Sequence, residues 1–122
     1  MEKKILIVED ELSLLNVLQE KFENEGFDVL GAKNGKVGLG LALSEKPDLI
    51  LLDIVMPIMD GITMLKELRK DKWGKDACVI MLTNLNESGK VSESLEKGVH
   101  DYLIKTDWSL KDLVKKVKRK LS

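Results

Sequence analysis

Three carboxylates directly follow two apolar segments and could together hold a divalent cation. Asp53 closes the run 49–52, and Glu9 and Asp10 close the run 5–8. Burying a carboxylate is costly, and carboxylates that lie close together repel one another, so packing alone does not explain acids at these positions. If the two runs are neighbouring strands, the three side chains converge at one edge of a sheet. Oxygen ligands of this kind suit magnesium.

Five short apolar runs alternate with five longer segments of helical period. We expect strands at Lys4–Val8, Asp28–Ala32, Asp48–Leu52, Ala77–Leu82 and Tyr102–Ile104. The runs near residues 5, 50 and 80 are almost wholly apolar, which is typical of strands covered on both faces, whereas the mixed second run predicts an edge strand. Strict alternation predicts right-handed crossovers and an α/β fold, a doubly wound parallel sheet with helices on both faces.

The helical segments differ in strength. Clear apolar stripes lie at 14–22, 62–68 and 110–121; Gly26 is the expected cap after the first, and Ser109 opens the last. The segment 37–43 is predicted to be weak, because Gly38 and Gly40 each cost about 1 kcal/mol relative to alanine. The segment 88–95 is also weak because it is mostly polar.

Length and composition favour one domain, 1–122, and give no global reason to expect a nucleic-acid or membrane partner. The formal net charge of the 122 residues is -1, and no apolar stretch approaches the roughly 20 residues of a membrane span. The single cysteine, Cys78, lies in an apolar run and is interpreted as a small buried hydrophobe. One cysteine cannot form an internal disulfide, so a reducing, cytoplasmic setting fits.

In doubly wound sheets ligands bind beyond the carboxyl ends of the strands, which adds Thr83, Asn84, Lys105 and Thr106 to the acids. Carboxylates repel phosphate, so these acids would make a poor phosphate-binding loop. No cysteine or histidine lies near the carboxyl ends of the strands, which disfavours zinc. Magnesium fits, and an aspartate can attack phosphorus to form an acyl phosphate. The Lys105 ammonium and the Thr83 hydroxyl would then contact phosphoryl oxygens.

Four sequence pieces carry a resemblance to a known family. They are Ile7-Val8-Glu9-Asp10-Glu11, Leu52-Asp53-Ile54-Val55-Met56-Pro57-Ile58-Met59-Asp60-Gly61, Leu82-Thr83 and Asp101-Tyr102-Leu103-Ile104-Lys105. With them the chain resembles, over all 122 residues, the receiver domain of bacterial two-component response regulators, including the stand-alone chemotaxis type. The resemblance implies a flavodoxin-like three-layer α/β/α fold with five helices and a five-stranded sheet of order 2-1-3-4-5.

The resemblance also implies roles for individual residues. Asp53 matches the phosphoacceptor, and Glu9, Asp10 and Asp53 match the carboxylates that hold Mg²⁺, together with the backbone carbonyl of Val55.

A second group matches the residues that contact the phosphoryl group or respond to it. Lys105 and Thr83 match the catalytic lysine and hydroxyl, and the backbone of Asn84 matches a phosphoryl contact. Thr83 and Tyr102 match the switch pair, and Gly61 matches a residue that shapes the loop after the acceptor.

As a receiver, the chain is expected to take a phosphoryl group from a phosphohistidine on a sensor histidine kinase or a histidine phosphotransfer protein. It would catalyse only its own phosphorylation and dephosphorylation and would not be a turnover enzyme. Phosphorylation would change the face of the fourth helix, fifth strand and fifth helix, which engages the next partner and could also pair two copies. The sequence fits both a stand-alone regulator and an excised domain.

Two departures from the family affect kinetics. The family's lysine-proline pair is Lys105-Thr106 here, and a cis bond before threonine costs about 2.5–4 kcal/mol, so we predict a trans bond. Val55 and Leu85 are apolar and cannot orient a water, and Asn84 adds bulk, which together predict slow hydrolysis of the acyl phosphate.

Several alternatives stay open. The acids could each be solvated loop residues, and His100 is interpreted as a turn or surface residue. The chain could be a phosphorylation-independent pseudo-receiver that acts only by binding. A dehalogenase-type aspartyl phosphatase would need a second aspartate where Val55 stands. The last helix has a basic outer face that is either merely solvated or a docking surface; its residues are Lys111, Lys115, Lys116, Lys118, Arg119 and Lys120.

Overall fold

The structure is a computed structural model that describes residues 2–83, 101–104 and 109–122, and for residues 83 and 101–104 it describes the backbone. The strands are β1 (Lys4–Val8), β2 (Asp28–Ala32), β3 (Leu49–Asp53), β4 (Val79–Thr83) and β5 (Asp101–Ile104). The helices are α1 (Leu12–Asn24), α2 (Gly35–Glu45), α3 (Gly61–Lys70), the 3₁₀ helix η1 (Gly74–Asp76) and α5 (Leu110–Leu121). The helix expected at 88–95 lies outside the described residues.

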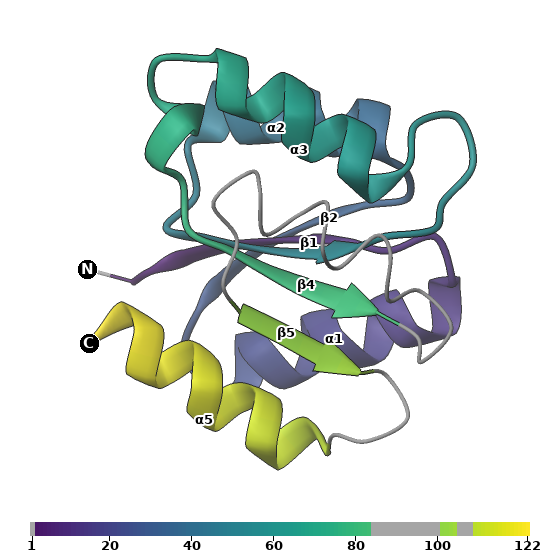
Figure 1. The fold of residues 1–122 in the computed structure, drawn as a ribbon. Helices are drawn as coiled ribbons and strands as arrows, with labels where there is room; N and C mark the ends of the chain where they lie inside the picture. The colour runs from purple at the N-terminus through teal and green to yellow at the C-terminus, as the bar shows by residue number, and fades with distance from the viewer. Residues whose placement is uncertain (1, 84–100, 105–108) are drawn as a thin grey trace.

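The five strands form one parallel sheet in the order β2-β1-β3-β4-β5. This confirms the expected order and the edge position of β2. Val8 pairs with Leu52, and Asp53 pairs with Leu82, so the carboxyl ends of β1, β3 and β4 lie at one edge of the sheet (Figure 1). The residues that follow these three strands are therefore brought close together.

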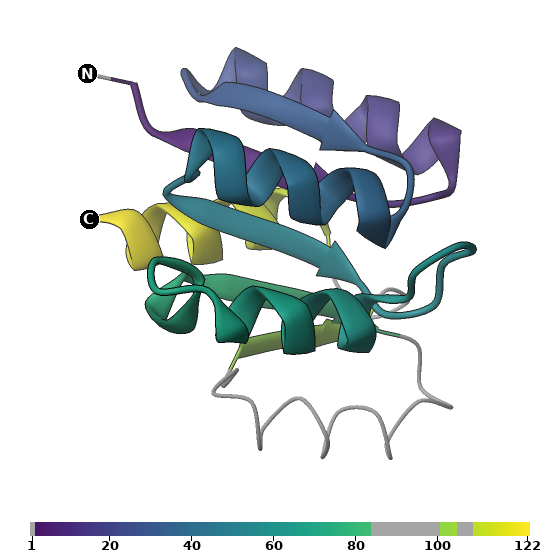
Figure 2. The same cartoon turned by 90° about the horizontal axis from the view of Figure 1, so that it is seen from above.

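Helices cover both faces of the sheet, as the apolar strands predict. Figures 1 and 2 show α2 and α3 on one face and α1 and α5 on the other. The apolar residues of β1 and β3 are fully buried and alternate between the two faces. Leu6, Val8, Ile50 and Leu52 pack toward α2 and α3, and Ile5, Ile7, Leu49 and Leu51 pack toward α1 and α5. These two strands are rigid supports for whatever their ends carry.

The helix ends follow the expected capping rules. Gly26, just beyond α1, has φ of +96°, a left-handed conformation that glycine adopts without a steric penalty. The Ser109 hydroxyl accepts a hydrogen bond from the Asp112 N–H at 3.2 Å and caps α5. Both predictions are confirmed.

The bounds of three strands differ from the prediction by one or two residues, and β5 begins one residue early, at Asp101. Strand β3 continues through Asp53 instead of stopping at Leu52, because Asp53 still pairs with β4. The expected strand 77–82 is shifted to Val79–Thr83, following η1. Arg69 stabilises this connection by donating from Nη1 to the carbonyl oxygens of Gly74 (2.7 Å) and Ala77 (2.9 Å), and its partial burial lowers the pKa of the guanidinium.

In the described ranges, no helix is long and apolar enough to span a membrane.

Candidate phosphoryl and metal site

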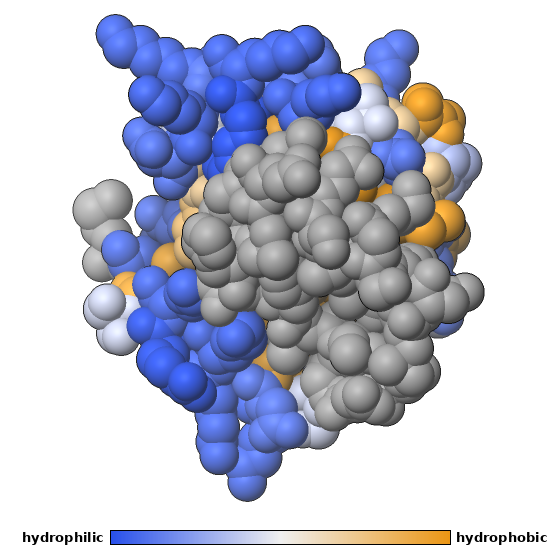
Figure 3. Space-filling view, in the orientation of Figure 1, coloured by the Kyte–Doolittle hydropathy of each residue, from blue (hydrophilic) through white to orange (hydrophobic). Residues whose placement is uncertain are grey.

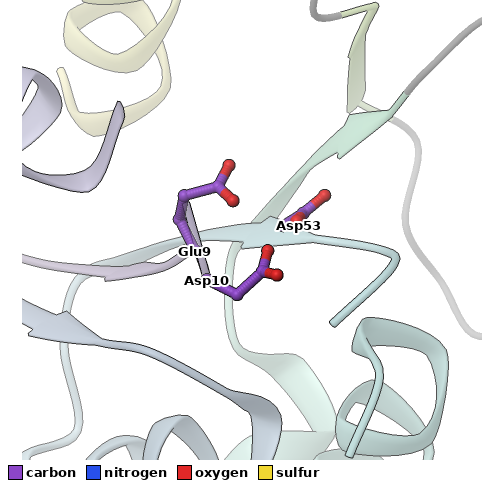
Figure 4. Close-up of side chains that lie close together, drawn as sticks. All are labelled: Glu9, Asp10 and Asp53. Carbon is purple, nitrogen blue, oxygen red and sulfur yellow. The ribbon is translucent and has the colours of Figure 1, made fainter. Parts of the chain in front are cut away.

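The three predicted acids come together at the carboxyl edge of the sheet. Glu9, Asp10 and Asp53 each offer one carboxylate oxygen, and these oxygens all lie within 4.8 Å of one another (Figure 4). Glu9 and Asp10 follow β1, and Asp53 is the last residue of the neighbouring β3. Parallel pairing of the two strands is therefore the cause of the convergence that the sequence predicts.

The acids differ in their exposure. The Glu9 side chain is fully buried and Asp53 is 2% exposed, whereas Asp10 is exposed to solvent. Glu9 is held in place because its Oε2 accepts a hydrogen bond from the Glu11 N–H at 3.1 Å. Its own N–H donates to the Ala32 carbonyl at 2.9 Å, which ties the end of β1 to β2. Two buried carboxylates and one exposed carboxylate at this spacing match what a hard divalent cation binds, so the residues fit magnesium.

The loop between β3 and α3 is closed tightly beside Asp53. The Gly61 N–H donates to the Ile54 carbonyl at 2.7 Å, and a Cβ at position 61 would collide with the Asp53 carbonyl oxygen. The fit requires glycine here, in agreement with the loop-shaping role that the sequence implies. Asp60 then starts α3 by accepting from the Thr63 N–H at 2.8 Å. Val55 lies in this loop with 53% of its surface exposed.

The other predicted site residues are described only in part. Thr83 is the last residue of β4, beside the strand that ends in Asp53, so its backbone reaches the same edge. Tyr102 lies in β5 and pairs with Met81. The remaining predicted features lie outside the described residues: Asn84, Leu85, His100, Lys105 and the Lys105–Thr106 bond. The structure therefore brings together the acidic part of the predicted site.

Sequence reasoning missed two supports of the acidic cluster. The Glu11 N–H orients the buried Glu9 carboxylate, and the Ala32 carbonyl anchors the Glu9 backbone. Both act through backbone groups, which every residue type possesses. The residue types therefore carry no signal for either contact; only the parallel pairing of β1 with β2 could have suggested the second.

Comparison with known proteins agrees with this geometry. The response regulator receiver domain family matches residues 5–118. The alkaline phosphatase synthesis transcriptional regulatory protein PhoP of Bacillus subtilis is 43% identical over 105 residues, which are 86% of this chain and 43% of PhoP. Response regulator PleD of Caulobacter vibrioides is 35% identical over 105 residues, 86% of this chain and 23% of PleD. The chain thus spans less than half the length of these relatives.

Solved structures of receiver domains resemble this chain over nearly its whole length. The receiver domain protein of Methanospirillum hungatei has a TM-score of 0.90 and 31% identity, covering 99% of this chain and 94% of that one. The chemotaxis response regulator CheY4 of Vibrio cholerae has a TM-score of 0.90 and 27% identity, covering 99% of this chain and all of the other.

Proposed function

Because the chain belongs to the response regulator receiver domain family of two-component systems, we propose that Asp53 is the residue that accepts the phosphoryl group. The observation that carries the proposal is the position of Asp53. Asp53 ends the central strand β3 and is 2% exposed. On one side it is flanked by the end of β1, which bears Glu9 and Asp10, and on the other side by the end of β4, which bears Thr83. We propose that residues 1–122 form one receiver domain in the cytoplasm.

The metal ligands in this proposal are the carboxylates of Glu9, Asp10 and Asp53 and the backbone carbonyl of Val55. Bound Mg²⁺ would supply positive charge that neutralises the phosphoryl oxygens during transfer. Exposed Asp10 would bind the ion from the solvent side. Buried Glu9, which is held by the Glu11 N–H, would bind it from the inner side.

In the transfer step, an oxygen of Asp53 forms a bond to phosphorus as the bond from phosphorus to the donor's imidazole nitrogen breaks. The released imidazole takes up a proton, and an acyl phosphate remains on Asp53. We propose that Lys105, the Thr83 hydroxyl and the Asn84 N–H contact the phosphoryl oxygens. Thr83 and Tyr102 would then carry the change to the face that includes β5 and α5.

The donor in this proposal is a sensor histidine kinase or a histidine phosphotransfer protein, and the chain catalyses only its own phosphorylation and dephosphorylation. The relative from Bacillus subtilis is named a transcriptional regulatory protein, so an effector that controls transcription is one output that fits. A dehalogenase-type phosphatase fits less well, because exposed Val55 cannot act as the acid that such an enzyme needs.

The test is phosphorylation by acetyl phosphate in the presence of Mg²⁺, followed on a phosphate-affinity gel and by intact mass. Wild type should be labelled and Asp53→Asn should not. Asp28→Asn is the matched control, because Asp28 is an exposed aspartate at the opposite end of the sheet, paired with Lys4. Full labelling of Asp53→Asn would refute the assignment. An unlabelled wild type would favour the pseudo-receiver, a binding module that has lost phosphorylation.

A further inference from the structure

The outward face of α2 carries no charge through its middle. Between Lys36 and Glu45 the exposed residues, which we call the α2 face, are Val37, Gly40, Leu43 and Ser44. Val37 is 48% exposed and Leu43 is 37% exposed. In Figure 2 this helix lies on the outside of the molecule, toward the viewer. Apolar side chains exposed to this extent lack the stabilisation that burial gives.

Gly40 lies at the middle of the α2 face, on the side of the helix that is turned away from the sheet. A Cβ at Gly38 would lie 2.8 Å from Val8 of β1, whereas a Cβ at Gly40 would have no described atom within 4 Å. Glycine inside a helix is unfavourable relative to alanine, and packing within the described part of the chain does not require it here. Glycine is the residue that allows another backbone to approach a helix closely.

The other described α-helices present charged residues to solvent. The exposed residues of α5 are mainly basic: Lys111, Lys115, Lys118, Arg119 and Lys120. Figure 3 shows the hydrophilic surface, at the lower left, where α5 lies in Figure 1. Helix α1 exposes Glu20 and Glu23, and α3 exposes Lys66 and Lys70. In a symmetric pair each surface meets its own copy, so like charges would meet on these three helices but not on the α2 face.

The α2 face is also complementary to itself. A twofold axis at Gly40 would reverse the direction of one helix relative to the other. Val37 is three residues before Gly40 and Ser44 is four residues after it, so along the helix they lie about 4.5 and 6 Å from the axis. Lys36 and Leu43 have the same spacing on the other flank of the helix. Val37 of one copy would therefore lie beside Ser44 of the other. Leu43 would lie beside the methylene stem of Lys36 of the other copy.

We propose that the α2 face binds a second copy of this chain, with the two helices antiparallel and crossing at Gly40. This pairing is distinct from pairing through β5 and α5, because α2 and α5 lie on opposite faces of the sheet (Figure 1). One helix crossing buries less than the roughly 1,600 Å² of a standard interface, so the pair is weak and dissociates on dilution. The proposal does not depend on the proposed role of Asp53, since association is measured without phosphorylation.

The experiment is sedimentation velocity of the full chain at concentrations from about 10 μM to 1 mM, the range in which weak pairs form. Gly40→Lys and Val37→Lys each place a charge in the α2 face, and in the first variant the two charges meet at the twofold axis. Val17→Lys is the matched control. Val17 is 46% exposed on α1, at the opposite face of the sheet, so this variant adds the same charge away from the α2 face.

The sedimentation coefficient of wild type should rise with concentration. Gly40→Lys and Val37→Lys should each raise the Kd for self-association about tenfold or more, the usual effect of disrupting a central interface contact, and Val17→Lys should behave like wild type. Lysine favours a helix more than glycine does, so Gly40→Lys should unfold at the same or a higher urea concentration than wild type. Loss of association is thereby separated from loss of folding.

Oxidative cross-linking locates the contact. Gly40→Cys should form a disulfide-linked dimer, because both copies of residue 40 lie at the twofold axis. Ser44→Cys should not link to its own copy, because the two residues would lie about 12 Å apart along the helices. Wild type, whose single cysteine is Cys78, is the control.

A wild type that stays monomeric at the highest concentration would overturn the proposal, as would an equal loss of association in Val17→Lys. Cross-linking of Ser44→Cys as fast as that of Gly40→Cys would also contradict it. Association that persists in both α2 variants would overturn it too and would place the pairing on another face of the chain.

Discussion

Asp10→Asn is expected to stabilise the protein without metal and to destabilise it relative to wild type with metal. Glu9, Asp10 and Asp53 hold their carboxylate oxygens within 4.8 Å of one another, so without a cation each charge raises the free energy of the folded state. Replacing Asp10 by its neutral isostere removes two of the three repulsive pairs. The same replacement removes a proposed ligand of Mg²⁺.

The magnitude follows from the separation. At 4.8 Å, the upper limit of the separations between the carboxylate oxygens, two unit charges repel by about 0.9 kcal/mol at the dielectric constant of water, the appropriate limit for the exposed Asp10 side chain. Two such pairs give a gain of about 1–2 kcal/mol for Asp10→Asn at low ionic strength. For a chain of 122 residues this corresponds to a rise in Tm of roughly 4–8 °C.

With Mg²⁺ added, wild type should become more stable than Asp10→Asn. Mg²⁺ at a hundred times its Kd stabilises wild type by about 2.7 kcal/mol, and the variant, which binds more weakly, gains less. The assay is thermal unfolding by circular dichroism, in EDTA and across a Mg²⁺ titration. Asp28→Asn is the control; because Asp28 faces Lys4, its loss should leave the EDTA Tm unchanged or slightly lower. An Asp10→Asn protein no more stable than wild type in EDTA would refute the reasoning.

Two further predictions concern α2 and the lifetime of the phosphorylated state. Gly38→Ala should destabilise the protein by about 1–2 kcal/mol, because the new Cβ would lie 2.8 Å from Val8 and 3.1 Å from Met64. Gly40→Ala, whose Cβ would have no atom within 4 Å, should stabilise the protein by about 0.5–1 kcal/mol. Urea unfolding of both variants tests this, and similar changes in stability for the two would contradict it. Because exposed Val55 is apolar and cannot orient a water, the acyl phosphate on Asp53 should last minutes to hours. Val55→Asn should shorten its half-life in a phosphoryl-decay assay. A wild-type half-life of seconds would contradict this prediction.

The sheet and the acidic cluster were predictable because they depend on side-chain type. Fully apolar runs at 5–8 and 49–52 indicate strands buried on both faces, and parallel pairing then brings the residues that follow them to one edge. The boundary at Asp53 was wrong by one residue, since a carboxylate at the end of a run looks like the start of a loop although its backbone still pairs with β4. Hydrogen-bond partners, and not polarity, decide where a strand ends.

Backbone contacts were not predictable in the same way. Gly38 and Gly40 read alike in the sequence, yet only Gly38 faces a close neighbour, because the register of α2 on β1 decides which glycine meets Val8. The backbone conformation of Ile58 was harder still to predict, because β-branched residues disfavour positive φ. The loop that holds Ile58 is tied to the start of α2 by a hydrogen bond from the Gly35 N–H to the Met59 carbonyl, which joins residues far apart in the sequence.

Two unfavourable local arrangements adjoin the same edge of this sheet, the crowded carboxylates and the left-handed Ile58. Each can be relieved by an alternative residue, asparagine at position 10 or asparagine at position 58, without any demand from the packed interior, because both side chains are exposed. Packing therefore does not account for either residue. Both are supported by β1 and β3, whose apolar residues are fully buried and provide the stability that tolerates local strain. Both arrangements lie at the edge where the cation and the phosphoryl group are proposed to bind, which is where selection for binding would place them.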